Sequence, residues 1–304
     1  MMRPLVVGWY GPSDGPWGWI QSQFENVILL TDENVQDWVS KPQPRDPNAS
    51  QLLIVASEHR ADRKAITWLE NGLLSGMLNG SGSTAKGASK IPFAAILGND
   101  WHGHRRTSPL PDGLPNFYWY QWYDRIFPWV SEVVGQAAER NRLAKKNKSA
   151  GNRPSESTPW RVQWLIDRSI WQSTMLRQSQ SSHSLAWIVT DHGDGRDLWR
   201  DACSVAGLHV VVSRLSRDPP GLDPSLIVID CVSRSEDSEP AIRGAAQAVR
   251  EQYPDALLAL VDPFPTWARW SDWKISGVDA ILPRPAAVQG FLFYWQAWRS
   301  QVAA

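Results

Sequence analysis

Five apolar runs in the second half of this 304-residue chain constrain its fold more than any other feature. They lack the apolar–polar alternation of a strand with one face in water, and three of them close on an aspartate. Continuous apolar strands are typical of a parallel sheet that is covered on both faces. The runs cover residues 184–191, 209–212, 225–230, 256–262 and 279–282.

Helical patterns separate these runs. Residues 197–207 carry Leu198, Ala202 and Val205 at helical spacing and end at a glycine suited to a C-cap. Pro240 stands where the first turn of a helix tolerates it, and residues 289–299 would form a closing helix. Strands that alternate with helices predict a flavodoxin-like α/β domain.

The first half repeats this pattern less regularly. Residues 5–9, 27–31, 52–56 and 93–97 are apolar runs, and an amphipathic helix is expected between the last two. A chain of this length is comfortable as two domains. We therefore predict two tandem flavodoxin-like, three-layer α/β domains with parallel sheets, and duplication of one fold is a plausible origin. The predicted parts are residues 1–140, a connecting part 141–182, and residues 183–304.

The connecting part begins with a basic stretch and then becomes rich in serine and proline. Thr158 is a good N-cap for a following helix that carries Trp160, Trp164 and Trp171 along one side. We predict a linker and an amphipathic helix between the domains. A nucleic-acid role for the basic stretch is disfavoured, because it is short and no recognised binding motif accompanies it.

Charge and composition exclude several classes of protein. The 31 basic and 31 acidic side chains give a formal net charge of zero, so no global field attracts nucleic acid or anionic lipid. No stretch approaches the ~20 apolar residues of a membrane span, and the N-terminal residues do not resemble a signal peptide. The two cysteines give no disulfide framework. These features predict a cytoplasmic protein without membrane association.

Tryptophan is unusually frequent, with 19 residues. Such a number indicates either aromatic-rich cores or an aromatic contact surface. The core-filling alternative stays open. The candidate interaction residues are Trp160, Trp164, Trp171, Trp267, Trp270 and Trp273.

Residues 276–285 combine small residues, a short strand and a basic residue before proline, Arg284-Pro285. This is the most specific part of a resemblance between residues 184–303 and response-regulator receiver domains. In that family, acids at the end of strand one hold a divalent cation, and an aspartate ending strand three accepts a phosphoryl group. A hydroxyl residue ending strand four and a lysine before a proline contact the phosphoryl oxygens. The resemblance assigns these positions to Asp191, Asp230, Asp262 and Arg284, respectively.

Two of these positions depart from the family pattern. Asp262 would add a negative charge beside a phosphoaspartate where a hydroxyl should donate a hydrogen bond. The planar guanidinium of Arg284 does not place a point charge as lysine does. We therefore predict a degenerate crevice in which Arg284 pairs with the carboxylates. Two alternatives stay open, namely a magnesium ion held by Asp191 and Asp230 together with Asp262, and surviving phosphotransfer at Asp230.

The first half could be a second, more diverged copy of the same domain. Trp9 and Tyr10 stand where its first strand ends, and Ala56 and Ser57 where its third strand ends. We expect a crevice with aromatic walls and no acceptor acid.

A separate candidate metal site lies at Asp100, His102 and His104, after the fourth strand of the first half. Two histidines in this spacing can chelate zinc when a third ligand arrives from elsewhere. This site would suit the alternative function, a small-molecule or nucleotide-dependent enzyme with its site in a cleft between the halves. The favoured function is a non-catalytic signalling or adaptor protein with pseudo-receiver domains and no cofactor. It would bind a protein partner, or a second copy of itself, independently of phosphorylation.

Overall fold

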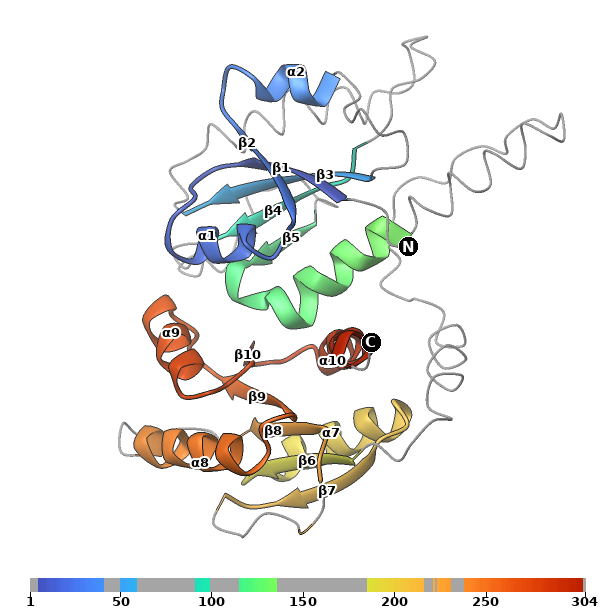
Figure 1. Cartoon of the computed structure of the whole chain (residues 1–304), viewed down its shortest axis with the longest axis vertical. Helices are drawn as coiled ribbons and strands as arrows, with labels where there is room; N and C mark the ends of the chain where they lie inside the picture. Colours follow the sequence, from blue (N-terminus) through green and yellow to red (C-terminus); the bar gives the residue numbers. More distant parts are fainter. Residues whose placement is uncertain are drawn as a thin grey trace, which may run out of the picture. The chain divides into compact units, whose positions relative to one another are not determined.

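A computed structural model describes residues 5–40, 50–58, 91–98, 115–135, 185–215, 221, 223–230 and 238–302. Contacts within the chain divide it into two compact units (Figure 1). The segment Tyr120–Pro128 groups with the second unit, although Trp119 and Trp129 on either side of it group with the first. The predicted boundary at residue 140 would assign this segment to the first domain.

The first unit contains a five-stranded parallel sheet with strand order β2-β1-β3-β4-β5. Four of its strands match the predicted apolar runs, and the short fifth strand was not among them. The strands are β1 (Leu5–Tyr10), β2 (Asn26–Leu30), β3 (Ser50–Ser57), β4 (Phe93–Leu97) and β5 (Asn116–Tyr118).

Helices α1 (Gly15–Gln21) and α2 (Val35–Ser40) cover opposite faces of this sheet. Adjacent residues of a strand point to opposite faces, and the neighbouring residues Gly8 and Trp9 of β1 contact different helices. Trp9 packs toward Trp17 of α1, with ring centroids 6.5 Å apart. On the other face, Trp38 of α2 lies against Gly8, where a Cβ atom would be only 2.7 Å from the ring. Glycine is therefore required for α2 to approach the sheet this closely.

The second unit has the same topology, with strand order β10-β9-β8-β6-β7 and parallel pairing throughout. In both sheets the chain-order arrangement is 2-1-3-4-5, which is the flavodoxin-like order. The prediction of two flavodoxin-like domains with parallel sheets is confirmed. The strands are β6 (Leu185–Thr190), β7 (His209–Ser213), β8 (Leu226–Asp230), β9 (Leu257–Asp262) and β10 (Ala280–Pro283).

Among the described residues, helices α7, α8, α9 and α10 flank this second sheet (Figure 1). Trp199 of α7 meets Phe291 of α10 edge-on, with centroids 6.0 Å apart, so these two helices share one face. An ion pair between Arg243 and Asp272 links α8 and α9 on the other face. Within the described ranges, no helix is both long and apolar enough to cross a membrane. The helices are α7 (Gly193–Val205), α8 (Ser238–Gln252), α9 (Trp267–Ile275) and α10 (Val288–Val302).

The buried face of α7 differs from the predicted one. Leu198 and Val205, expected to face the core, are each 54% exposed. Trp199 and Cys203 are buried instead. The two stripes lie one residue apart, and the stripe with the larger aromatic side chain faces the sheet because it buries more apolar area.

The segment Tyr120–Pro128 packs on α9, β10 and α10 of the second unit. Its Tyr123 ring stacks on Trp270 at 5.7 Å and meets Tyr294 edge-on at 4.8 Å. The Tyr123 hydroxyl donates a 2.8 Å hydrogen bond to the carbonyl oxygen of Asp279. Phe127 meets Tyr294 edge-on at 5.1 Å. These aromatic contacts make the segment part of the core of the second unit.

Candidate functional site

Asp230, the predicted acceptor position, ends β8 and is 4% exposed. Its Oδ1 forms an ion pair with Arg284. Its Oδ2 accepts a 2.9 Å hydrogen bond from the indole Nε1 of Trp199. Gly195 allows α7 to lie close, since a Cβ there would be 3.0 Å from the same Oδ2. Both carboxylate oxygens are therefore engaged by side chains of the unit itself.

Strand order explains why Arg284 reaches Asp230 from a distant part of the sequence. Strand β9 separates β8 from β10, and all three are parallel, so their carboxyl ends meet at one edge of the sheet. Arg284 directly follows β10 at that edge and is 34% exposed at its side chain. The pairing places a cation against a carboxylate that would otherwise be buried and uncompensated.

Asp262 ends β9 and is also buried, but it belongs to a different set of contacts. Its Oδ2 lies 3.0 Å from Nε of Arg269 and accepts a 2.9 Å bond from Nε1 of Trp273. Its Oδ1 accepts the backbone N–H of Phe264 at 2.9 Å. The cation that faces Asp262 is thus Arg269 of α9, and Arg284 pairs with Asp230.

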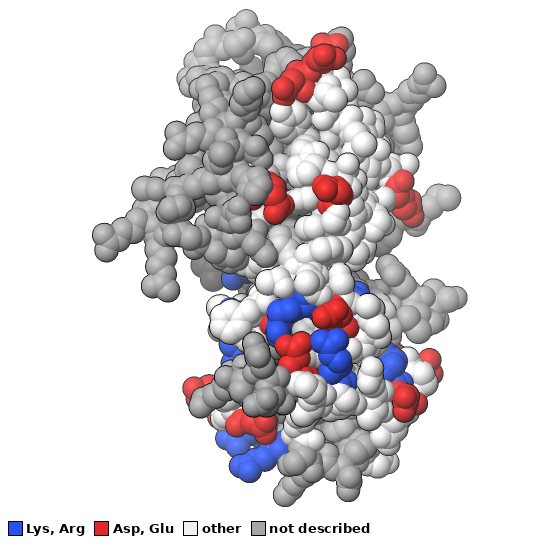
Figure 2. All heavy atoms as spheres, turned by 90° about the vertical axis from the view of Figure 1, so that its left-hand side faces the viewer, with Lys and Arg blue, Asp and Glu red and all other residues white. Residues whose placement is uncertain are grey.

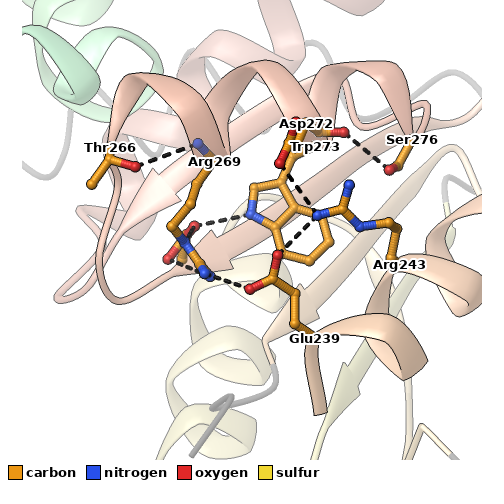
Figure 3. Close-up of polar contacts among 8 residues, drawn as sticks. Glu239, Arg243, Thr266, Arg269, Asp272, Trp273 and Ser276 are labelled. Atoms are coloured by element: carbon orange, nitrogen blue, oxygen red, sulfur yellow. Dashed lines mark hydrogen bonds and ion pairs between the residues drawn. The ribbon is translucent and has the colours of Figure 1, made fainter. Parts of the chain in front are cut away.

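Arg269 connects Asp262 to a charged network between α8 and α9 (Figure 3). Its Nη1 lies 2.5 Å from Glu239, and Arg243 binds the same carboxylate at 2.8 Å. Burial acts to raise the pKa of Glu239, but the hydrogen bonds and charges of the two arginines together lower it. Figure 2 shows the resulting surface, on which basic and acidic side chains interleave over α8 and α9.

The two arginines of this network also lie over the ring of Trp273, at 5.1 Å for Arg243 and 5.9 Å for Arg269. A cavity of about 10 Å³ adjoins Asp262, Arg269 and Trp273, which is room for about one water molecule. The network therefore covers the carboxyl end of β9 and links α8 to α9 through ion pairs.

Asp191, the predicted cation-binding acid, directly follows β6 and is exposed to solvent. Across the part of the chain that the structure describes, no group of three or more His, Cys, Asp or Glu side chains could hold a metal ion. The structure thus separates the predicted four-residue crevice into an Asp230–Arg284 pair, an Asp262–Arg269 pair and a solvent-exposed Asp191.

The predicted aromatic contact residues differ in how far they are buried. Trp270 and Trp273 are buried, so they belong to the core of the second unit and are not available on its surface. The reason is that both point inward from α9, one toward Tyr123 and one toward Asp262. Trp267 is half-buried. The remaining predicted contact residues lie outside the described residues, namely Trp160, Trp164 and Trp171. The predicted metal site also lies outside them, at Asp100, His102 and His104.

The first unit contains a counterpart of the Trp199–Asp230 bond that was not predicted. Glu58, directly after β3, accepts a 2.7 Å hydrogen bond from Nε1 of Trp17 on α1. In each unit, a tryptophan on the helix after the first strand thus binds an acid at the end of the third strand. The strand-end positions Ala56 and Ser57 carry no acid, and Glu58 lies one residue beyond them.

The sequence matches no protein-family model and no curated protein significantly. Among solved structures, a Thermotoga maritima response regulator shares 11% identity over 40% of this chain and all of its own, with a TM-score of 0.32. The chemotaxis response regulator CheY4 of Vibrio cholerae shares 16% over 38% of this chain and 98% of its own, with a TM-score of 0.33.

A third similar structure spans both units. The C-terminal part of RcsC from E. coli, which contains a linker region and a phosphoreceiver domain, shares 12% identity over 99% of this chain and 96% of its own, with a TM-score of 0.31. These similar structures include receiver domains, the family that the sequence resembles. The second unit has the flavodoxin-like fold that the sequence resemblance to receiver domains implies. Its strand order is 2-1-3-4-5, and Asp230 and Arg284 lie at one edge of the sheet.

The bond between Trp199 and Asp230 predicts a measurable loss of stability. We expect Trp199→Phe to lower the free energy of unfolding of the second unit by about 1.5–3 kcal/mol, because a buried charged acceptor loses a donor. Trp187→Phe is the matched control, since that indole donates to the neutral hydroxyl of Ser213 at 2.9 Å. Trp187→Phe should lower the free energy of unfolding by about 0.5–1.5 kcal/mol. Equal losses in urea unfolding would contradict the special role of the carboxylate.

Proposed function

We propose that this chain is a non-catalytic signalling module whose second unit is a pseudo-receiver. In this proposal it acts on protein partners without phosphorylation and without a resident magnesium ion. The observation that carries the proposal is the engagement of both oxygens of Asp230, one by Arg284 and one by Trp199.

The chemistry of phosphoryl transfer explains why this observation matters. An acceptor carboxylate must present a free oxygen in line with the phosphorus atom, and cations must neutralise the charge that develops on the phosphoryl oxygens. At Asp230, a guanidinium and an indole N–H occupy the two oxygens. Asp262, the second acid at this edge, is bound by Arg269. The internal cations therefore supply the charge balance that a metal ion would supply in a conventional receiver.

Exposed apolar side chains of the second unit are candidate positions for a protein contact. Phe264 is 72% exposed and lies three residues before α9, and Ile275 is 83% exposed and ends α9. Leu198 and Val205 form a second exposed pair on α7. Burial of large apolar side chains against a partner stabilises the complex, because it removes apolar surface from water. A partner contact at either pair would not involve Asp230.

The experiment exposes the purified chain to magnesium and then to acetyl phosphate or beryllofluoride. Tryptophan fluorescence and intact mass are the readouts, and Trp187 on β6 and Trp199 beside Asp230 serve as internal reporters. We expect no added phosphoryl group and no saturable change in emission. A conventional receiver domain, treated in parallel, shows that the reagents are active. A saturable response that disappears in Asp230→Asn would mean that phosphoryl chemistry survives, and the proposal would be wrong.

A further inference from the structure

Asp124 is a buried carboxyl group in the middle of the segment Tyr120–Pro128. It is 2% exposed, and its Oδ2 accepts the backbone N–H of Ala287 at 3.1 Å, directly before α10 begins. Its Oδ1 is inaccessible to solvent and has no hydrogen-bond partner. A buried carboxylate with an unsatisfied oxygen is costly, whereas a protonated carboxyl group is far less so.

The segment Tyr120–Pro128 packs closely on α10 around the buried Asp124. The segment lies directly on the backbone of α10, because a Cβ atom at Gly290 would be 2.0 Å from the carbonyl oxygen of Asp124 and 3.4 Å from Pro128. The rings of Tyr123 and Phe127 pack against Tyr294 on either side of it. Water can therefore reach the Asp124 carboxyl group only if the segment moves away from α10.

The surrounding charges compensate a negative charge on Asp124 only in part. Burial raises its pKa to about 7, while the N–H of Ala287 and the nearby charge of Arg125 act to lower it. The other titratable groups of the elements packed on this segment are already engaged. Tyr294 is in ring contacts, Lys274 and the Asp279 backbone bind Tyr123, and Arg284 pairs with Asp230.

We propose that Asp124 is a proton-operated latch, which holds Tyr120–Pro128 on the second unit when its carboxyl is protonated and releases the segment when the proton is lost. The latch acts through the N-terminal end of α10 and does not involve Asp230. The second unit would therefore respond to pH independently of Asp230, whose two carboxylate oxygens bind Arg284 and Trp199.

The direction of the pH effect follows from the two states of the segment. The docked carboxyl binds its proton more tightly than the released one, whose pKa has the ordinary value of 3.8. Docking is therefore strongest below about pH 4 and weakens about tenfold per pH unit up to about pH 7. Above about pH 7 no further loss occurs, because both states are ionised. Between pH 5 and 7.5 the expected loss of docking is roughly 50- to 100-fold.

The test is hydrogen–deuterium exchange of the full chain at pH 5 and pH 7.5, corrected for intrinsic exchange. We expect the protection of peptides covering residues 120–128 and 285–290 to fall roughly 50- to 100-fold, while a peptide from β6 stays constant. In Asp124→Asn, the amide keeps an oxygen for the Ala287 N–H and cannot ionise, so protection should change less than about threefold. Asp201→Asn, at an exposed position on α7, is the matched control and should behave as the wild type.

Two outcomes would overturn the proposal. One is pH-independent protection of residues 120–128 in the wild type, and the other is an unchanged pH response in Asp124→Asn. If that variant does not fold, a ¹³C carboxyl titration of the wild type decides the question. The Asp124 carboxyl should still carry its proton at pH 5, where exposed aspartates are ionised, and titration of Asp124 with those exposed aspartates would refute the latch.

Discussion

Replacing Gly290 by alanine should lower the free energy of unfolding of the second unit by about 3 kcal/mol and displace the segment Tyr120–Pro128. The added Cβ would lie 2.0 Å from the carbonyl oxygen and 3.0 Å from the carbonyl carbon of Asp124. Both atoms belong to the backbone, so no rotation of a side chain can relieve the overlap. Urea unfolding followed by hydrogen exchange measures the second unit separately from the first.

Gly244→Ala is the matched control for this substitution. Gly244 lies within α8, and a Cβ atom there would meet nothing within 4 Å. Alanine has the higher helix propensity, so this variant should gain about 0.5–1 kcal/mol of stability. A comparable gain in Gly290→Ala would mean that Tyr120–Pro128 does not pack on α10 as described.

Arg284→Ala should lower the free energy of unfolding by about 2–4 kcal/mol. The substitution leaves the buried carboxylate of Asp230 with the Trp199 indole as its hydrogen-bond donor. Because the Arg284 side chain is 34% exposed, water can enter after its removal and moderate the loss. The effect should be visible as a lower midpoint in urea unfolding of the full chain.

A surface ion pair provides the comparison for Arg284. Arg196 and Asp197 are 3.0 Å apart on α7, with side chains 48% and 58% exposed. Solvent screens such a pair, so Arg196→Ala should lower the stability far less than Arg284→Ala. If the two variants lose the same stability, Asp230 does not depend on Arg284 in the way that its burial implies.

The fold was predictable because strand identity depends on short, local apolar runs. All five strands of the second sheet coincide with predicted runs, and the 2-1-3-4-5 order follows the expected α/β class. Helix α9 was not predicted. It is a short helix, and the sequence feature that indicates its start is the N-cap residue Thr266. The Thr266 hydroxyl accepts a hydrogen bond from the backbone N–H of Arg269.

The site was predictable only where a residue's position along the strand decides its neighbours. Asp230 and Arg284 meet because each ends or directly follows a parallel strand. Arg269 lies within α9, so its reach to Asp262 depends on how the helix is rotated on the sheet. The bond between Trp17 and Glu58 likewise depends on packing between α1 and β3, which the local pattern does not specify.

The least predictable feature was the role of Tyr120–Pro128. Nothing in its aromatic composition indicates that Tyr123 will stack on Trp270, which lies far along the chain. Contacts between distant segments depend on shape complementarity, and hydrophobic periodicity carries no information about it. The one-residue error in the buried face of α7 has the same origin, because Leu198 and Trp199 are both reasonable core residues until the sheet is present.

The membership of Tyr120–Pro128 in the second unit affects how this chain can be divided. A shortened recombinant chain that begins at β6 would contain every strand of its sheet and still lack the rings that cover Trp270 and Tyr294. Its Lys274 would also lose the hydroxyl of Tyr123 as a neighbour. The second unit is therefore not encoded by one continuous stretch of the gene, and a recombination event between the two halves would transmit it incomplete.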